Sequence, residues 1–455
     1  MAAPPSPQDE VATHIIVYRS DVDPDSVTNE FVATHGLRAT RTFRYAIKGA
    51  AVVVPPGRLA ALQHDPRVAY VEANQMFHAH AQSLPTGVDR INADIDLTAK
   101  INGVDERVNA DIAILDTGID LTHPDLNLYR YTNCTVGTVN KHCVDNDSGA
   151  NDGFGHGTHV AGIAAALDNG TGVVGVAPGA RLWAVKVLDN TGNGTTGSVI
   201  AGIDYVTAHA SEIDVANMSL GCVCTSTAMN TAISNSVAAG VVYTVSAGND
   251  MLDVANVTPA NNPSAIIVSA LADFDGKPSG LSNASQGYTT CTENQDDSFA
   301  CFSNFGSGVT IMAPGVNILS TWMGGGTAIL SGTSMSSPHV AGAAALYRVK
   351  HPGSTPDQVK AGLLAEADPT PCANSGNGHC SDDPDGIQEP LVMLQGPDGD
   401  VAPVGNPDGK IDIADYLVIE RIALGRVAPT TQELLHGDLY PPGAPDGVID
   451  IRDLL

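Results

Sequence analysis

The sequence predicts an α/β protein built on a doubly wound, mostly parallel sheet, with a smaller domain on either side of it. Two observations predict this fold. Between about residues 81 and 366, buried apolar runs such as "ADIAILDTG", "LWAVKVL" and "GVVYTVSAGN" alternate with glycine-bounded helical segments, which is typical of a parallel sheet with helices on both faces. The chain of 455 residues also exceeds what one hydrophobic core usually covers.

The segments flanking the sheet domain have different patterns. Residues 1–10 are rich in proline and polar residues and are predicted to be a disordered leader. Residues 11–80 alternate strand-like runs with two helical segments, which predicts a small α+β unit. Residues 367–398 are rich in Pro, Gly, Asp and Asn and form a linker, in which "DGIQEPLVML" could be a last strand of the main domain. An acidic repeat occupies residues 399–455.

The overall charge narrows the range of partners. The net charge of −28 argues against nucleic acid and anionic membranes, and it suits solubility and bound divalent cations. No apolar run in the sequence is long enough to span a membrane. The first residues, "MAAPPSPQDE", lack the charged and apolar regions of a signal peptide. The protein is therefore either cytoplasmic or a secreted protein whose signal peptide has been removed.

The cysteines favour the secreted alternative. Eight of them fall into four near-neighbour pairs, Cys134/Cys143, Cys222/Cys224, Cys291/Cys301 and Cys372/Cys380. None of the pairs has the spacing of a zinc site. Even numbers in local pairs favour disulfides and an oxidising compartment, although the sequence does not determine the pairing. The alternative is that several are free buried thiols.

Three stretches of the sheet domain carry residues suited to catalysis. "IAILDTGID" ends a strand on Asp116, "GHGTHVAG" places His156 at the start of a helix, and "SGTSMSSPHVAG" places Ser334 where a glycine turn enters a long apolar helix. A serine hydroxyl becomes a good nucleophile when a base removes its proton, and the base needs a carboxylate to fix its tautomer. The three residues therefore predict nucleophilic catalysis.

Each motif also has a simpler interpretation. Asp116-Thr117-Gly118 and Asp147-Ser148-Gly149 could be the two halves of an aspartic peptidase, but they lie only 31 residues apart. His156 and His159 could bind a metal or cap a core, and Ser334 could be a plain helix-cap serine. For the sequence not to encode a catalytic site, all of these simpler interpretations would have to be true at once. The catalytic interpretation is therefore favoured.

The motifs resemble those of the subtilisin-like serine proteases, the subtilase family, over about residues 11–366. The resemblance implies a fold of the subtilisin type and a serine endopeptidase in which Ser334 attacks, His156 transfers the proton and Asp116 orients the histidine. "SAGN" matches the family's oxyanion-hole segment, so Asn249 and the backbone N–H of Ser334 are the expected donors to the oxyanion. In the family, the position of His159 is structural.

One glycine-rich stretch allows two interpretations. "LWAVKVLDNTGNGTTGSVIAG" has the outline of a dinucleotide-binding fingerprint, but no second half-fold follows it. In subtilases this loop forms one edge of the substrate cleft, and the segment matching "SLG" forms the facing edge, so a peptide would be held mainly through its backbone. The expected substrate-binding residues are Gly192, Asn193, Gly194, Ser219, Leu220 and Gly221. The bond between Thr258 and Pro259 matches a family position where a cis peptide occurs.

The segment before the sheet domain resembles the subtilase propeptide. That domain is a small ferredoxin-like sheet backed by two helices, and it assists folding and inhibits the protease with its C-terminal strand. "AQSLPTG" resembles the mature N-terminus of the family, so self-cleavage is expected between His80 and Ala81. The alternative is an unrelated small binding domain in residues 11–80.

Two further stretches match a calcium site of the family. Asp125 in "THPDL" corresponds to a ligand, and "ALDNGTGVVGVAP" corresponds to the loop that completes the site. The implied ligands are Gln82, Asp125 and Asn169 with the carbonyls of Leu167, Thr171 and Val173. Oxygen ligands of this mixed kind suit Ca²⁺ rather than a transition metal. The alternative is an ordinary polar loop.

The acidic tail contains the same stretch twice. "GDVAPVGNPDGKIDIADYL" and "GDLYPPGAPDGVIDIRDLL" share twelve identities at an offset of 38 residues, and each reproduces the second half of a calcium loop, D-G-x-x-D-x-x-D. The first aspartate stands four residues too early, which we interpret as a matched insertion. The predicted ligands are Asp400, Asn406, Asp408, Lys410, Asp412 and Asp415 in the first repeat, and Asp438, Asp446, Val448, Asp450 and Asp453 in the second.

The paired loops resemble a dockerin, with "IADYLVIERIALG" as an amphipathic helix after the first loop. This resemblance implies calcium binding and a possible cohesin-like scaffold as partner, and the alternative is a solvated acidic tail. The sequence as a whole thus predicts a secreted, calcium-stabilised serine endopeptidase that is made as a self-processing zymogen and acts on protein or peptide substrates. The competing hypothesis is a catalytically silent binding protein that is docked through its tail.

Overall fold

The computed structural model describes residues 13–55, 57–74, 82–136, 143–278, 282, 286–288, 291–369, 383–394, 418–419, 421–423 and 426. The chain forms two compact units, Met1–Ala79 and His80–Leu455.

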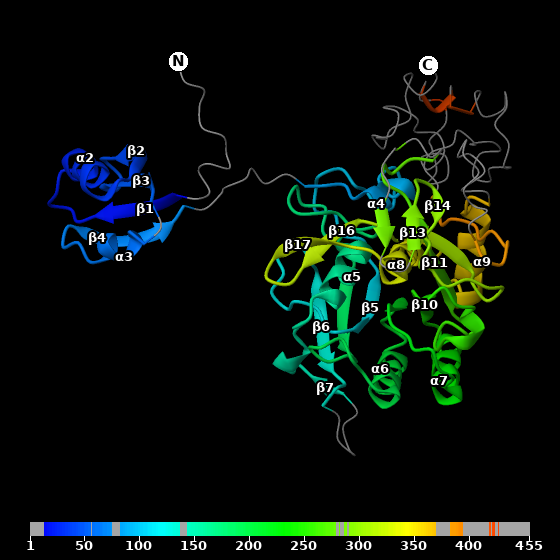
Figure 1. Cartoon of the computed structure of the whole chain (residues 1–455). Helices are drawn as coiled ribbons and strands as arrows, with labels where there is room; N and C mark the ends of the chain where they lie inside the picture. Colours follow the sequence, from blue (N-terminus) through cyan, green and yellow to red (C-terminus); the bar gives the residue numbers. More distant parts are fainter. Residues whose placement is uncertain are drawn as a thin grey trace. The chain divides into compact units, whose positions relative to one another are not determined.

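The first unit is a four-stranded antiparallel sheet with two helices (Figure 1). Its elements are β1 (Thr13–Tyr18), α2 (Pro24–His35), β2 (Arg38–Phe43), β3 (Gly49–Val53), α3 (Leu59–Gln63) and β4 (Val68–Ala73). The strands lie in the order β2-β3-β1-β4, and with the βαββαβ chain order this is a ferredoxin-like arrangement. Helix α2 begins after Asp23, which accepts a hydrogen bond from the N–H of Ser26, and ends at Gly36 in the left-handed conformation. The hydrophobic core of this first unit includes the fully buried Ile16 and Phe31.

The second unit is built on a nine-stranded, mostly parallel sheet (Figure 1). The strand order is β14-β11-β10-β9-β5-β8-β6-β7, with β15 also paired to β11. Among the described strands of this sheet, the pairs β6–β7 and β11–β14 are antiparallel and the others parallel. The strands are β5 (Asp111–Asp116), β6 (Leu128–Asn133), β7 (Val144–Asp145), β8 (Arg181–Lys186), β9 (Val215–Met218), β10 (Val242–Ser246), β11 (Ile266–Ala272), β14 (Ser298–Phe299) and β15 (Ile311–Pro314). The predicted α/β sheet is thereby confirmed.

Strand β5 shows how helices cover both faces of this sheet. Ile112 and Ile114 lie in one hydrophobic core with residues of α5 (His156–Ala165) and α8 (Thr333–Lys350). Ala113 and Leu115 lie in a second core with residues of α6 (Thr196–Ala208) and α7 (Thr227–Ala238). Because successive side chains of a strand point to opposite faces, the apolar run of β5 fills both cores.

Shorter elements complete the second unit. They are α4 (Thr86–Arg90), the 3₁₀ turns η1 (Ser148–Ala150) and η2 (Val254–Asn256), α9 (Pro356–Glu366), and the antiparallel pairs β12 (Gln286–Tyr288) with β13 (Cys291–Asn294) and β16 (Ile318–Trp322) with β17 (Gly326–Leu330). The peptide bond between Thr258 and Pro259 is cis, as the family resemblance implied.

Residues 385–394 do not form the strand that the sequence suggested. Within "DGIQEPLVML", all of which the structure describes, Leu391 forms isolated bridges to Met312 and to Asp368, and no strand is built. A strand requires several consecutive residues that pair with a neighbouring strand. In this segment only Leu391 is paired, with Met312 of β15 and with Asp368 after α9. Residues 418–419 and 421–423 are helical, inside the helix predicted after the first acidic repeat.

Two of the cysteine pairs form disulfides. Cys134 is bonded to Cys143 and Cys222 to Cys224, and Cys301 is also disulfide-bonded. The side chain of Cys291 and the whole of the Cys372/Cys380 pair lie outside what the structure describes. The bonded cysteines agree with the oxidising compartment expected from the sequence.

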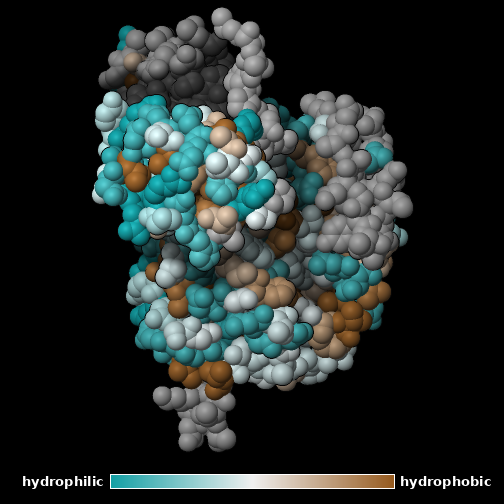
Figure 2. Space-filling view, turned by 60° about the vertical axis from the view of Figure 1, so that its left-hand side comes forward, coloured by the Kyte–Doolittle hydropathy of each residue, from teal (hydrophilic) through white to brown (hydrophobic). Residues whose placement is uncertain are grey.

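The face of the molecule shown in Figure 2 is mainly polar. On the face shown in Figure 2, hydrophobic residues form small separate patches in a largely hydrophilic surface. Among the helices that the structure describes, none has both the length and the apolar character needed to cross a membrane.

Candidate active site

The predicted catalytic residues lie at the ends of three secondary-structure elements. Asp116 is the last residue of β5, His156 is the first residue of α5, and Ser334 is the second residue of α8. Glycines precede both helices, Gly155 before α5 and Gly332 before α8. Each residue thus lies where a regular element meets a turn, as the sequence patterns predicted.

Asp116 and His156 form a direct pair. The Nδ1 atom of His156 lies 2.8 Å from Oδ1 and 2.9 Å from Oδ2 of Asp116. The carboxylate side chain is 0% exposed and the imidazole 21% exposed, so one end of the ring is buried and the other remains accessible. Burial alone would lower the pKa of His156, but the charge and hydrogen bond of Asp116, with a contribution from Asp152, raise it overall.

Asp152, which the sequence motifs did not single out, fixes both partners of this pair. Its buried carboxylate accepts hydrogen bonds from the Thr117 hydroxyl at 2.9 Å and from the N–H groups of Phe154, Gly155 and Thr158 at 2.8–2.9 Å. It also accepts one from the Thr158 hydroxyl at 2.6 Å. Thr117 adjoins Asp116, and the three N–H groups belong to the turn before α5 and to its first turn, so Asp152 joins the end of β5 to the start of α5. An aspartate closely preceding "GHG" is the only local signal for it.

Ser334 lies beside the cleft with its hydroxyl close to Ser219. The Ser334 Oγ atom donates to the carbonyl oxygen of Ser219 at 3.4 Å, and the hydroxyl of Ser219 donates to the carbonyl of Ser334 at 2.8 Å. Among the hydrogen bonds of the described residues, none joins Ser334 to His156. Catalytic hydrogen bonds are often long in the free enzyme and shorten when substrate binds.

Asn249 is oriented with its amide nitrogen free to donate. Its Oδ1 atom accepts hydrogen bonds from the N–H and from the hydroxyl of Thr333, both at 2.9 Å. Since the oxygen is engaged, the NH₂ group is the free end of the side chain. The N–H of Ser334 lies in the first turn of α8, where amides have no partner within the helix. A Cβ added to Gly332 would lie 3.4 Å from the Asn249 Nδ2 atom and 3.7 Å from the Ser334 nitrogen, so the two donors border the same space.

A cavity of about 380 Å³ lies at the predicted substrate-binding residues. All six expected substrate-binding residues line it, together with the imidazole of His156. Its apolar lining includes Phe154, Leu188, Val199 and Met229. Residues 192–194 lie on a loop before α6, and residues 219–221 follow β9, so two separate segments border the same space.

The glycine loop is not available to a phosphate. The Asp189 carboxylate accepts hydrogen bonds from the N–H groups of Thr191 and Asn193 at 2.8 and 3.1 Å. The first turn of α6 is closed by a capping box between Thr195 and Ser198. A dinucleotide would need these amides for its pyrophosphate, so the local geometry favours a cleft edge over a nucleotide site.

His159 is a buried structural histidine. Its Nε2 atom lies 3.1 Å from the carbonyl of Ile318 and 3.0 Å from that of Ala328, which joins α5 to the β16–β17 hairpin. Burial lowers the pKa of His159 to about 4, so the ring is neutral and donates from Nε2. Its Nδ1 atom is buried and makes no hydrogen bond, and among the described residues His159 belongs to no group of side chains that could share a metal ion.

The residues matched to a calcium site lie together. The Gln82 amide donates to the carbonyls of Leu167 and Val173 at 2.6 and 3.2 Å. Asp125 is 4% exposed, and its carboxylate accepts hydrogen bonds from the Asn169 amide at 2.9 Å and from the N–H of Val173 at 3.0 Å. Burial raises the pKa of Asp125 to about 6. Thr171 completes the loop through its N–H, which donates to Asn169 Oδ1 at 2.9 Å.

The other predicted site residues lie outside the described part of the chain. They are the cleavage residues His80 and Ala81 and the tail residues Asp400, Asn406, Asp408, Lys410, Asp412, Asp415, Asp438, Asp446, Val448, Asp450 and Asp453.

An α/β sheet that carries a buried carboxylate–imidazole pair beside a serine at a helix start is the arrangement of a serine hydrolase. Residues 109–386 match the model of the subtilase family. Subtilisin NAT from Bacillus subtilis subsp. natto is 38% identical over 341 residues, which cover 74% of this chain and 80% of that protein. An extracellular serine proteinase from Thermus sp. (strain Rt41A) is 38% identical over 348 residues, covering 75% of this chain and 76% of that protein.

A solved structure agrees with these sequences. The crystal structure of a cold adapted subtilisin-like serine proteinase superposes with a TM-score of 0.51 at 34% identity, over 68% of this chain and 98% of that one. The chain belongs to the subtilase family. It is a subtilisin-like serine endopeptidase that acts on protein or peptide substrates.

Proposed function

We propose that Ser334, His156 and Asp116 form the catalytic triad and that Asn249 stabilises the oxyanion. Ser334 attacks the scissile carbonyl while His156 takes its proton and later gives it to the leaving amine. Asp116 holds the imidazole by Nδ1 and stabilises the imidazolium. The observation that carries this proposal is the pair of 2.8 and 2.9 Å contacts from Nδ1 of His156 to the buried Asp116. It leaves Nε2 as the nitrogen that exchanges protons with the serine.

The oxyanion donors are the Asn249 amide and the N–H of Ser334. A tetrahedral intermediate places negative charge on the former carbonyl oxygen, and fixed donors stabilise it without reorganising during the reaction. The bonds from Thr333 to Asn249 Oδ1 support this role because they prevent the amide from presenting its oxygen instead.

The substrate is an extended peptide held between Gly192–Gly194 and Ser219–Gly221. Both segments line the cavity, and glycine at three of their six positions lets a peptide backbone approach closely. Recognition through main-chain hydrogen bonds implies broad sequence tolerance. The apolar lining by Leu188, Val199 and Met229 favours an apolar side chain at one substrate position.

The enzyme is made as a secreted zymogen that removes its own N-terminal segment. Two observations support this. Residues up to Ala79 form a separate compact unit, and the disulfide-bonded cysteines are compatible with an oxidising compartment. The propeptide comprises residues 11–80, and cleavage falls between His80 and Ala81. The released strand-rich unit then acts as an inhibitor of the mature protease.

A calcium ion stabilises the peptidase domain at the Asp125 loop. The donors gathered there are a buried carboxylate, two side-chain amides and carbonyls, which fit a hard cation. A Cβ added to Gly172 would lie 2.2 Å from Asp125 Oδ2, so the loop keeps that side of the carboxylate clear. Gln82, Asp125, Asn169 and the carbonyls of Leu167, Thr171 and Val173 would hold the ion. When bound, it supplies positive charge that offsets the buried carboxylate.

Residues 399–455 bind further calcium through their repeated aspartates. The support is the twelve identities between the two repeats at a constant spacing of 38 residues. No tail residue belongs to the catalytic constellation.

The competing function is a silent binding protein of the same fold. The specific observation in its favour is that Ser334 bonds to Ser219 rather than to His156. The decisive experiment incubates the purified chain with a peptide-bond substrate, with and without a serine-directed phosphonate, beside Ser334→Ala and Ser331→Ala. We expect turnover that the phosphonate and Ser334→Ala abolish and Ser331→Ala retains. Turnover in Ser334→Ala at the unmutated rate would refute the assignment of the nucleophile, and no turnover in the unmutated chain would favour the silent protein.

A further inference from the structure

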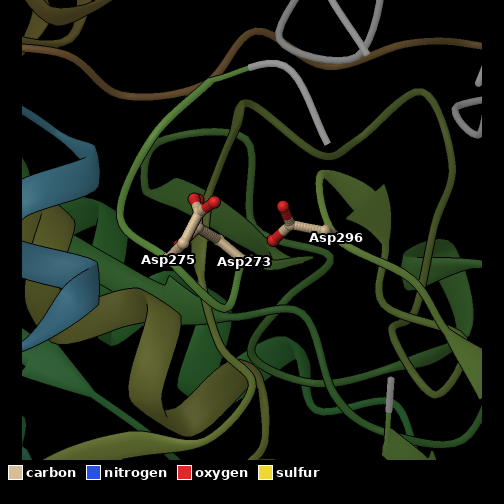
Figure 3. Close-up of side chains that lie close together, drawn as sticks. All are labelled: Asp273, Asp275 and Asp296. Atoms are coloured by element: carbon tan, nitrogen blue, oxygen red, sulfur yellow. The ribbon is translucent and has the colours of Figure 1, made fainter. Parts of the chain in front are cut away.

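A group of three carboxylates contains none of the proposed catalytic, substrate-binding or calcium-loop residues. One oxygen atom from each of Asp273, Asp275 and Asp296 lies within 4.8 Å of the other two. Asp273 and Asp275 directly follow β11, and Asp296 precedes β14, so the two ends of the insertion between these strands meet there. Figure 3 shows Asp296 facing the other two side chains.

Asp273 supplies an observation beyond the mere presence of acidic residues. The residue is 1% exposed, and its Oδ2 atom has no hydrogen-bond partner. The Nε atom of Arg90 lies 3.1 Å from it, but that N–H donates to Oδ1 of Asp297. Leaving a buried polar atom without a hydrogen bond is unfavourable, because it has lost its bonds to water. The carboxylate of Asp273 thus has an oxygen that lacks a hydrogen-bond donor and lies in a group with two other carboxylates, which suits a cation ligand.

The charges around the cluster do not balance. Asp273, Asp296 and Asp297 are each at most 3% exposed, and within the described residues around them Arg90 is the buried cation. Asp89 also lies nearby, because a Cβ added to Gly276 would lie 2.6 Å from its Oδ2 atom, and the positive charge of Lys277 acts on Asp89. Buried carboxylates in proteins are normally paired or bound to a metal.

The backbone holds the carboxylates in place. The N–H of Gly276 donates to Oδ1 of Asp273 at 2.7 Å. Asp296 accepts from the N–H of Phe274 and of Ser282, both at 2.8 Å. These bonds connect the two ends of the insertion through Asp296. The ligand atoms are therefore positioned by the fold rather than by flexible surface side chains.

We propose that Asp273, Asp275 and Asp296 bind a Ca²⁺ ion that fastens the insertion between β11 and β14 to the sheet. Two oxygens on one Ca²⁺ can be up to about 5 Å apart, since Ca–O distances are about 2.3–2.6 Å, and the cluster fits within that limit. Mg²⁺ binds at about 2.0–2.1 Å and demands a tighter shell. The site uses none of the residues of the Asp125 loop and is independent of peptidase activity.

The test counts calcium ions in the full chain. All proteins carry Ser334→Ala to prevent self-digestion, are equilibrated with CaCl₂ and desalted, and bound calcium is measured per chain. Asp273→Asn and Asp275→Asn are compared with Asp204→Asn, which removes the same charge from an exposed position on α6. We expect each cluster variant to bind one ion fewer and the control to bind as many as the parent. An unchanged count in both cluster variants would overturn the proposal.

Thermal unfolding separates a metal site from a purely structural ion pair. In chelator, Asp273→Asn relieves repulsion among buried carboxylates, so its melting temperature should equal or exceed that of the parent. With CaCl₂ it should gain less than the parent does. If Asp273→Asn instead lowers the melting temperature equally with and without calcium, its partner is Arg90 alone and the proposal is wrong. Equal protection of the parent by the same concentration of MgCl₂ would overturn the assignment to calcium.

Discussion

The imidazole of His156 contacts both oxygens of Asp116, at 2.8 and 2.9 Å, although 40 residues separate them in the chain. The carboxylate is fully buried at the end of β5, whereas the ring is partly exposed at the start of α5. This pair determines which nitrogen of the ring faces the cleft. It also sets the pH at which the ring can act as a base.

When the pH is lowered, activity should therefore be lost at a higher pH than it would be with a histidine of ordinary pKa. A general base must be neutral, and the pKa of His156 is raised from its usual value of 6.5 by Asp116 and Asp152 in spite of burial. As pH falls, kcat/KM should decline through this raised pKa. Asp116→Asn should move the decline to lower pH and reduce kcat by roughly 10⁴-fold, the magnitude measured for the same substitution in another serine protease with this triad. A pH profile of kcat/KM that is unmoved by Asp116→Asn would contradict this role.

Asp152→Asn should reduce kcat more than it changes KM. The amide would place a donor against N–H groups and hydroxyls that now donate to the carboxylate, which loosens the start of α5 around His156. Removing the charge should also lower the apparent pKa of the acidic limb. Asp147→Asn is the matched control, since Asp147 is half-buried and its carboxylate caps η1 and accepts a hydrogen bond from the Asn133 amide, with no bond to α5. If both variants had the same pH profile, Asp152 would be structural only.

Asn249→Ala should lower kcat by roughly 10²–10³-fold with KM nearly unchanged, a range measured in subtilisin for loss of its oxyanion-hole asparagine. The reason is that its amide contacts charge that exists only in the transition state. Asn256→Ala, at an exposed position of η2, serves as the control and should keep full kcat. An effect on KM alone would assign Asn249 to substrate binding instead.

Chelation should destabilise the peptidase domain. An ion bound only by the folded state at 100 times its dissociation constant contributes about 2.7 kcal/mol, which corresponds to roughly 5–10 °C in a domain of this size. Asp125→Ala should remove part of that gain, whereas Asp105→Ala, an exposed residue paired with Arg107, should not. Differential scanning calorimetry with calcium and with chelator measures both. Identical calcium-induced shifts in all three proteins would exclude a site at Asp125.

The isolated segment 395–455 should gain helix when calcium is added and lose it in chelator. Bringing the aspartates of each repeat together is repulsive without a cation, so metal binding and ordering are coupled. Asp412→Ala with Asp415→Ala should block this gain for the first loop and leave turnover of small substrates nearly unchanged. Circular dichroism against calcium concentration is the measurement. A flat titration of the unmutated segment would leave only an acidic tail.

The sequence by itself determined the sheet, its two helical faces and the positions of Asp116, His156 and Ser334. These features depend on local patterns. An apolar run buried on both faces predicts a parallel strand, and a glycine before an apolar helical period predicts a helix start. The same dependence on local patterns explains why the strand expected in "DGIQEPLVML" is absent. A short apolar run does not reveal whether a neighbouring strand edge is free to pair with it.

Only the tertiary structure decided which residues surround those positions. Asp152 reaches Thr117 across 35 residues, Ser219 reaches Ser334 across 115, and Arg90 reaches Asp297 across 207. The order of strands in the sheet sets these contacts, and no period in the sequence encodes that order. The tertiary structure also decided which carboxylates are buried. Nothing in the sequence distinguishes Asp273 from the other aspartates of this acidic chain, but the fold removes it from water. The cost of burying a charge is a property of its three-dimensional surroundings, which is why the structure rather than the sequence points to this carboxylate as a metal ligand.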